Sequence, residues 1–199
     1  MEILSYSMKW FELTLRWGHV LFAILWVGNS FLFNYLDNKL NKNISSRDVD
    51  AEGYLMHSGY YYKLTRLKSS PPVNYLRGLV IFKWQSYLTF ITGMLLLAVL
   101  YYYNSSILMV DKRILVLSPI AAISCSLLSM VISWIVYDSI CKTKIINNNF
   151  LFLTLMLFLL GFLSFGLTKI FGAKFAFLSV GLIIGTNMFA NVFTVIIPN

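Results

Sequence analysis

The 199-residue chain is 58% hydrophobic and 12% charged, which excludes an ordinary soluble domain, where about a quarter of residues are charged. Its 16 Lys and Arg outnumber its 8 Asp and Glu and give a formal charge of +8. Most of these basic residues fall between long apolar runs, so we attribute the charge to anionic headgroups and membrane orientation rather than to nucleic acid. The composition predicts a protein of the lipid bilayer.

Five apolar runs are each long enough to cross a bilayer, for which roughly 20 helical residues are needed. We predict spans at about 11–36, 79–103, 114–137, 150–168 and 174–197. The first run lacks a cleavage pattern and is expected to be a retained helix. These runs are too long and too continuously apolar for barrel strands. The expected fold class is therefore all-α, a polytopic transmembrane helix bundle that forms a single domain over residues 1–199.

One long polar loop, residues 37–77, follows the first span. Its middle, residues 54–67, mixes tyrosines with basic side chains, a composition suited to the headgroup layer. The loop is long enough to hold a short helix that could cap the bundle. Nine basic residues on this side of the membrane against six on the other favour a cytoplasmic loop and an external amino-terminus.

Two stripes of small or amide side chains predict where helices pack against each other. One stripe lies in the third span and the other in the fifth. The two glycines of the stripe in the fifth span have G-x-x-x-G spacing. Asn187 and Asn191 must find hydrogen-bond partners in a hydrocarbon environment, either on a neighbouring helix or on a ligand. The stripes consist of Ala122, Ser126, Ser129 and Ser133, and of Gly181, Gly185, Asn187 and Asn191.

The first span carries a histidine, His19, inside its apolar run. An ionisable group at membrane depth costs roughly 2.5 kcal/mol or more, so it usually faces a partner, a cofactor or a watery cavity. Helical spacing places it in a polar stripe that resembles the lining of a cofactor or substrate pocket. In the alternative reading, Glu12 and Arg16 lie at the membrane interface and His19 bonds a neighbouring helix. The stripe comprises Glu12, Arg16, His19, Ala23, Trp26, Ser30 and Asn34.

Three further side chains are candidates for the same site. His57 in the polar loop is either solvated or a second ligand or proton carrier that approaches from the membrane surface. Lys83 begins the second span and either snorkels toward headgroups or balances the charge of a haem propionate or an anionic substrate, with Tyr87 a turn deeper. The two cysteines, Cys125 and Cys141, imply neither a disulfide framework nor covalent haem.

Short motifs in chain order resemble the membrane domain of the bacterial cytochrome c-linked urate oxidases over essentially the whole chain. The first span carries the opening motifs, the polar loop and the second span carry the next ones, and the closing run is the most specific. The motifs are Leu15-Arg16-Trp17-Gly18-His19-Val20, Ile24 to Phe31, Asn34 to Asn38, His57-Ser58-Gly59-Tyr60-Tyr61, Phe82-Lys83-Trp84 with Tyr87 and Gly93, Trp134 with Val136-Tyr137-Asp138, Gly166-Leu167-Thr168, and Gly185-Thr186 with Met188, Ala190-Asn191-Val192-Phe193 and Val195-Ile196-Ile197-Pro198-Asn199.

This resemblance implies an integral protein of the bacterial inner membrane that oxidises urate to 5-hydroxyisourate and passes electrons to a c-type cytochrome on another chain or segment. A second likeness, of the first span alone, is to membrane haem proteins of the protoporphyrinogen oxidase type and implies haem b. The expected residues are Lys83, Tyr87 and Arg16 for catalysis, and His19, His57 and Trp26 for haem binding, with His19 and His57 as iron ligands.

The chain departs from the family pattern at three places. The family has a histidine, a glutamate and a second histidine where this chain has Val80, Gln85 and Ser179. The chain also stops at Asn199, before the family's cytochrome c domain, as a fragment or a shortened relative would. These departures motivate a second hypothesis, a non-catalytic membrane subunit of a larger respiratory or transport complex.

Overall fold

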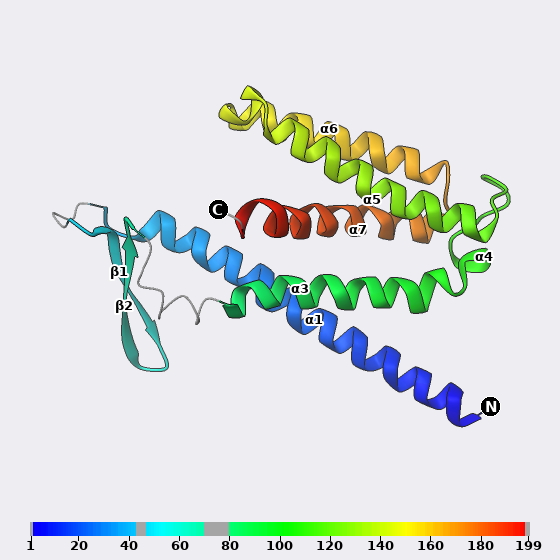
Figure 1. Ribbon diagram of the computed structural model, residues 1–199, viewed down its shortest axis with the longest axis horizontal. Coiled ribbons are helices and arrows are strands. Elements are labelled where there is room, and N and C mark those ends of the chain that lie inside the picture. The colour runs from blue at the N-terminus through cyan, green and yellow to red at the C-terminus, as the bar shows by residue number, and fades with distance from the viewer. Residues whose placement is uncertain (1, 43–46, 70–79, 198–199) are drawn as a thin grey trace. The chain divides into compact units, whose positions relative to one another are not determined.

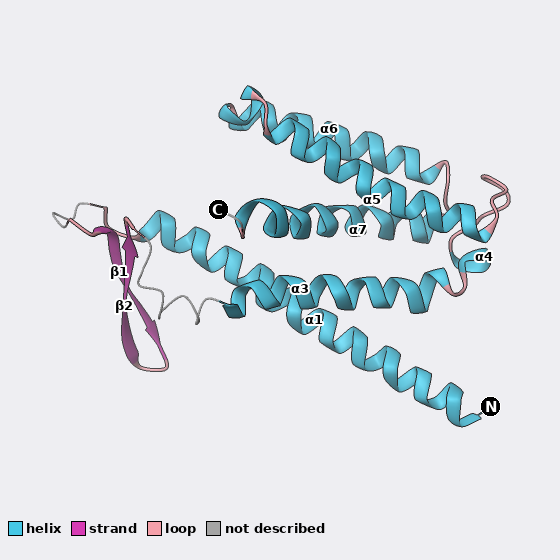
Figure 2. Ribbon diagram, in the orientation of Figure 1, coloured by secondary structure: helices cyan, strands magenta, loops and turns pink. Residues whose placement is uncertain are grey.

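The computed structural model describes residues 2–42, 47–69 and 80–197 and consists of helices and one β-hairpin (Figures 1 and 2). The end of the predicted polar loop, the first residue of the predicted second span and the last two residues of the closing motif lie outside these residues. The α-helices are α1 (Glu2–Lys39), α3 (Val80–Leu96), α4 (Ser105–Leu108), α5 (Pro119–Cys141), α6 (Asn149–Thr168) and α7 (Ala173–Asn191). Helix α3 continues as the π-helix η2 (Leu97–Tyr102), α7 continues as the π-helix η4 (Val192–Ile196), and the 3₁₀ helix η3 (Lys144–Asn147) precedes α6. The strands are β1 (Val49–His57) and β2 (Tyr60–Leu67).

Within the described residues, five helices are long enough and apolar enough to cross a membrane. They coincide with the five predicted spans, and the helical fold class is confirmed. Helix α1 begins at Glu2, well before the predicted start at residue 11, and the third span begins later than its predicted start at residue 114. Helix α5 begins at Pro119 because Ser118 caps it, its Oγ accepting a hydrogen bond from the Ala121 N–H at 3.2 Å, and because proline is favoured in the first helical turn.

The chain divides into two compact units. The first, called here the helical unit, comprises Met1–His19 and Tyr87–Asn199, and the second, the hairpin unit, comprises Val20–Ser86. The organisation of the chain as a single transmembrane domain remains a prediction.

The core of the helical unit lies where α5 and α6 contact α7. Phe171 and Phe175 are fully buried there, and Tyr101 of η2 packs its ring against Phe175. The predicted small-residue face of α5 is confirmed as a packing face: Ala122 and Ser126 are buried against the neighbouring helices.

Asn187 of α7 bonds a neighbouring helix, as one of the two predicted alternatives requires. Its Nδ2 donates to Ser133 Oγ of α5 at 2.9 Å. By contrast, the G-x-x-x-G pair of α7 makes no close approach, because a Cβ atom at Gly181 or Gly185 would meet nothing within 4 Å among the described residues. The prediction that this glycine pair packs against another helix is therefore wrong for the chain by itself.

The polar loop forms a β-hairpin rather than the predicted short helix. Strands β1 and β2 pair in antiparallel register, with Tyr54 opposite Lys63 and His57 opposite Tyr60. Ser58 and Gly59 join them with φ angles of 51° and 81°, the left-handed pair that a two-residue hairpin turn requires. Runs of tyrosine also favour strands over helices. The turn chemistry and the β-propensity together explain the correction.

Polar contacts tie the base of the hairpin to the end of α1. The guanidinium of Arg66 donates to Asp37 of α1 at 2.7 Å and to Asp50 of β1 at 2.6 Å. Hydrogen bonds to Asp50 and then to Asp37 raise the pKa of Arg66, so the group remains a cation at all ordinary pH values. Asn41 and Glu52 exchange backbone hydrogen bonds beside this cluster. The hairpin thus has a fixed attachment at the end of the first helix.

Replacing Arg66 with methionine should release this attachment. We expect amide hydrogen exchange in residues 49–67 to accelerate by about two- to fivefold, the range set by surface ion pairs. Lys63→Met is the matched control, because among the described residues Lys63 pairs with Glu52 across the hairpin at 2.7 Å and not with α1. Equal exchange in the two variants would show that Arg66 does not anchor the hairpin.

Candidate functional site

His19 of α1 is held by α3 within the helical unit. Its Nδ1 lies 3.0 Å from the carbonyl oxygen of Thr89 and 3.1 Å from Oγ1 of Thr92. Thr92 Oγ1 in turn donates to the Leu88 carbonyl oxygen at 2.6 Å. The alternative in which His19 bonds a neighbouring helix is therefore correct as far as Nδ1 is concerned.

These contacts determine the tautomer of the imidazole. A carbonyl oxygen only accepts, and the single proton of Thr92 Oγ1 is already directed to Leu88, so Nδ1 must carry the hydrogen. In the neutral ring Nε2 is then unprotonated and carries the free lone pair of the imidazole. None of the described residues bonds Nε2. His19 therefore presents a basic nitrogen while its other nitrogen fixes the ring, an arrangement typical of histidines that bind metals.

Gly93 lets α3 approach the imidazole closely. A Cβ atom at this position would lie 2.9 Å from Cε1 and 3.4 Å from Nδ1 of His19, and real Cβ contacts are longer than the first of these distances. Thr89 and Thr92 were not predicted from the sequence, and Gly93 was identified only through a family motif. A small residue beside two threonines on one face of a predicted span is the signal that could have found them.

Arg16 lies one turn before His19 on α1 and forms an ion pair within its own helix. Its Nε and Nη2 donate to Glu12 Oε1 at 2.9 and 2.7 Å. The side chain of Arg16 is 53% exposed, so this pair contributes little to stability. The position of Glu12 and Arg16 at the membrane interface, one of the two predicted alternatives, remains a prediction.

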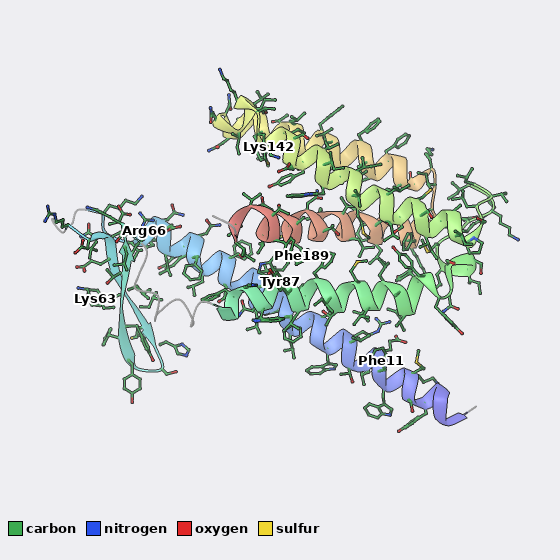
Figure 3. The ribbon with its side chains drawn as sticks, in the orientation of Figure 1. Phe11, Lys63, Arg66, Tyr87, Lys142 and Phe189 are labelled. Atoms are coloured by element: carbon green, nitrogen blue, oxygen red, sulfur yellow. The ribbon has the colours of Figure 1, made fainter. Side chains whose placement is uncertain are left out.

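Tyr87 joins an aromatic cluster between α3 and α7 (Figure 3). Its ring lies edge-on to Phe189 at a centroid distance of 5.8 Å and tilted against Phe193 at 6.0 Å. Phe90 stacks on Phe189 at 4.0 Å with an interplanar angle of 4°. Thr89 and Phe90 are adjacent in sequence, so α3 holds the imidazole with one side and the aromatic cluster with another.

The remaining predicted site residues belong to the hairpin unit. Trp26 is half-buried on α1, Lys83 is exposed near the start of α3, and His57 is exposed at the hairpin turn. Their approach to His19, including the predicted role of His57 as a second ligand, remains a prediction.

Two of the positions that depart from the family pattern have structural roles here. Gln85 Oε1 accepts a hydrogen bond from Asn29 Nδ2 at 2.7 Å, which joins α3 to α1 within the hairpin unit. Ser179 is 2% exposed and donates to the Phe175 carbonyl oxygen of its own helix at 2.7 Å. The side chain of Val80 lies outside the described set.

The described residues contain no group of three or more His, Cys, Asp or Glu that could hold a metal ion. A haem iron needs only one or two protein ligands, because the porphyrin supplies the other nitrogens, and histidine is a common axial ligand. His19 fits that requirement through its unprotonated Nε2.

The fold and this histidine define a helical protein with several candidate membrane spans and one imidazole whose Nδ1 is held by a neighbouring helix. The chain matches the family described as urate oxidase N-terminal over residues 5–199, and it belongs to that family. This finding confirms the family suggested by the sequence motifs. No curated protein and no solved structure matches the chain.

Substituting Gly93 with alanine should displace the imidazole. The added methyl group would meet Cε1 at 2.9 Å, and overpacking of this kind costs about 1–3 kcal/mol. Thermal unfolding in detergent should show a lower midpoint for Gly93→Ala. Gly161→Ala is the control, since a Cβ atom there meets nothing within 4 Å and alanine favours the helix. Unfolding at the same temperature in both variants would refute a tight contact at Gly93.

Proposed function

We propose that the chain is the membrane part of a urate-oxidising system that uses haem b. The observation that carries this proposal is the fixed tautomer of His19 in a member of the urate oxidase N-terminal family. Oxidation of urate by addition of water yields 5-hydroxyisourate, two protons and two electrons. Each electron leaves for a c-type cytochrome, the proposed acceptor.

The exposed apolar side chains support a location in the bilayer. Ile24 of α1, Phe158 of α6 and Phe177 of α7 are 64%, 71% and 85% exposed, as are many other large apolar side chains of the long helices, and proteins in water rarely expose so much apolar surface. In a bilayer, lipid tails would cover these side chains, so that their exposure would carry no hydrophobic free-energy penalty. We assign the chain to the bacterial inner membrane on this basis together with the family resemblance.

The residues of this chain would act on haem and substrate by position and charge. Haem supplies one-electron chemistry when it is bound. His19 Nε2 would ligate the iron, while the Thr89 carbonyl oxygen holds the ring in place and increases the basicity of Nε2. Trp26 would lie against the haem, and His57 would serve as the second ligand if the hairpin brings it close.

Arg16, Lys83 and Tyr87 would serve the anionic substrate. Arg16 uses Nε and Nη2 for Glu12, which leaves the Nη1 donors for a urate oxygen. Lys83 is a second cation for urate or for a haem propionate. Tyr87 would orient the substrate ring through its phenol group.

Replacing His19 with alanine should abolish both haem retention and urate-dependent reduction of added cytochrome c. The unchanged chain and the variant are both supplied with haem during expression and purified. They are then compared by their reduced-minus-oxidised optical spectra and by their rates of cytochrome c reduction. His57→Ala is the matched histidine control: if His57 is the second ligand, this variant keeps haem but changes the spectrum. Full activity in His19→Ala would contradict the proposal.

The alternative is a non-catalytic subunit of a larger respiratory or transport complex. It is favoured by Gln85 and Ser179, which make helix contacts where the family has ionisable side chains. An affinity-tagged chain would then recover a stoichiometric partner from mild detergent and remain colourless after haem supplementation. A pigmented isolated chain would exclude this alternative.

A further inference from the structure

The half of the hairpin nearest the turn is unusually rich in exposed large side chains. Five of them are at least half exposed within residues 54–62, at values from 50% for Tyr62 to 78% for Tyr61. Water-exposed surfaces seldom gather aromatic residues in this way. The five are Tyr54, Met56, Tyr60, Tyr61 and Tyr62; we call them the aromatic tip.

The exposed side chains occupy both faces of the ribbon. Side chains alternate along a strand, and directly opposite residues share a face. The register pairs Met56 with Tyr61 on one face and Leu55 with Tyr62 on the other. A protein partner would cover one face of so thin a ribbon, whereas a lipid layer surrounds it on all sides.

Charge divides the hairpin along its length. Residues 54–62 contain no Asp, Glu, Lys or Arg, while the base carries Lys63, Glu52 and Arg66 in ion pairs (Figure 3). Tyrosine has an apolar ring and a polar hydroxyl group, and it is enriched where hydrocarbon meets water. The ribbon is therefore amphipathic from tip to base, with a tip chemistry that matches the membrane interface.

The attachment of the base places the hairpin at the bilayer boundary. Residues 17–36 of α1 contain no charged side chain and extend for about 30 Å as a helix, the thickness of the hydrocarbon core. Asp37 is the next residue, and it accepts the hydrogen bond from Arg66 at 2.7 Å. The ion pair that anchors the hairpin therefore lies where the first span leaves the hydrocarbon.

We propose that the aromatic tip inserts into the lipid headgroup layer beside the end of α1 and serves as an interfacial anchor for the first span. The occupant of this surface is the bilayer itself. The polar turn at Ser58 and Gly59 keeps the tip among the headgroups rather than in the acyl chains. The inference rests on the proposed membrane location of the chain.

Spin labels on one face of the hairpin test this insertion. Single cysteines replace Tyr61 and Thr65, which share a face, in a chain whose two native cysteines are changed by Cys125→Ala and Cys141→Ser. The chain is placed in nanodiscs of phosphatidylcholine with phosphatidylglycerol. Collision rates of each label with oxygen, which prefers lipid, and with a water-soluble nickel chelate are measured. We expect the oxygen-to-nickel ratio to fall severalfold from position 61 to position 65.

A label at Ile24→Cys tests the membrane location of the chain separately from the insertion of the aromatic tip. This exposed position on α1 should report lipid whatever the hairpin does. If position 24 reports lipid and position 61 reports water, the anchor is refuted, the membrane location stands, and the tip becomes a surface for another protein. If positions 24 and 61 both report water, the membrane location itself is refuted.

Discussion

The hydrogen bond from His19 Nδ1 to the Thr89 carbonyl oxygen is the interaction on which the proposed chemistry depends. An apolar helix that carries an imidazole must satisfy at least one of its nitrogens, because hydrocarbon offers no partner. This chain uses α3 for Nδ1, while none of the described residues bonds Nε2. The same contact thus meets a folding requirement and sets the tautomer on which the proposed haem ligation depends.

Helix α3 can hold the imidazole because one side of the helix carries small and hydroxyl-bearing residues while another side carries aromatic residues. Gly93 removes the atoms that would collide with the imidazole, and Thr92 adds a second acceptor. The side that carries Tyr87 and Phe90 packs against α7 through aromatic rings. A shift of α3 would therefore disturb both contacts, which couples the orientation of the imidazole to the aromatic packing.

Sequence patterns predicted the five long helices because continuous apolar runs of this length are too long for barrel strands and fit a membrane-spanning helix. They also predicted, among the alternatives, that His19 and Asn187 could each bond a neighbouring helix, and both do. The hairpin was not predicted because the composition of the loop suits a helix as well as a strand at the headgroup layer, and only the Ser58-Gly59 turn between tyrosine-rich runs distinguishes the two. The partners of His19 were missed because helical periodicity gives the face of a helix and not its neighbour.

The most direct test of this account is the tautomeric state of His19 measured by nitrogen NMR. The chain contains only two histidines, so ¹⁵N-histidine labelling gives two sets of ring signals, and a His57→Ala sample assigns them. In haem-free protein the account predicts that His19 carries its proton on Nδ1 and has an unprotonated Nε2. A proton on Nε2, or rapid averaging between the two nitrogens, would contradict it.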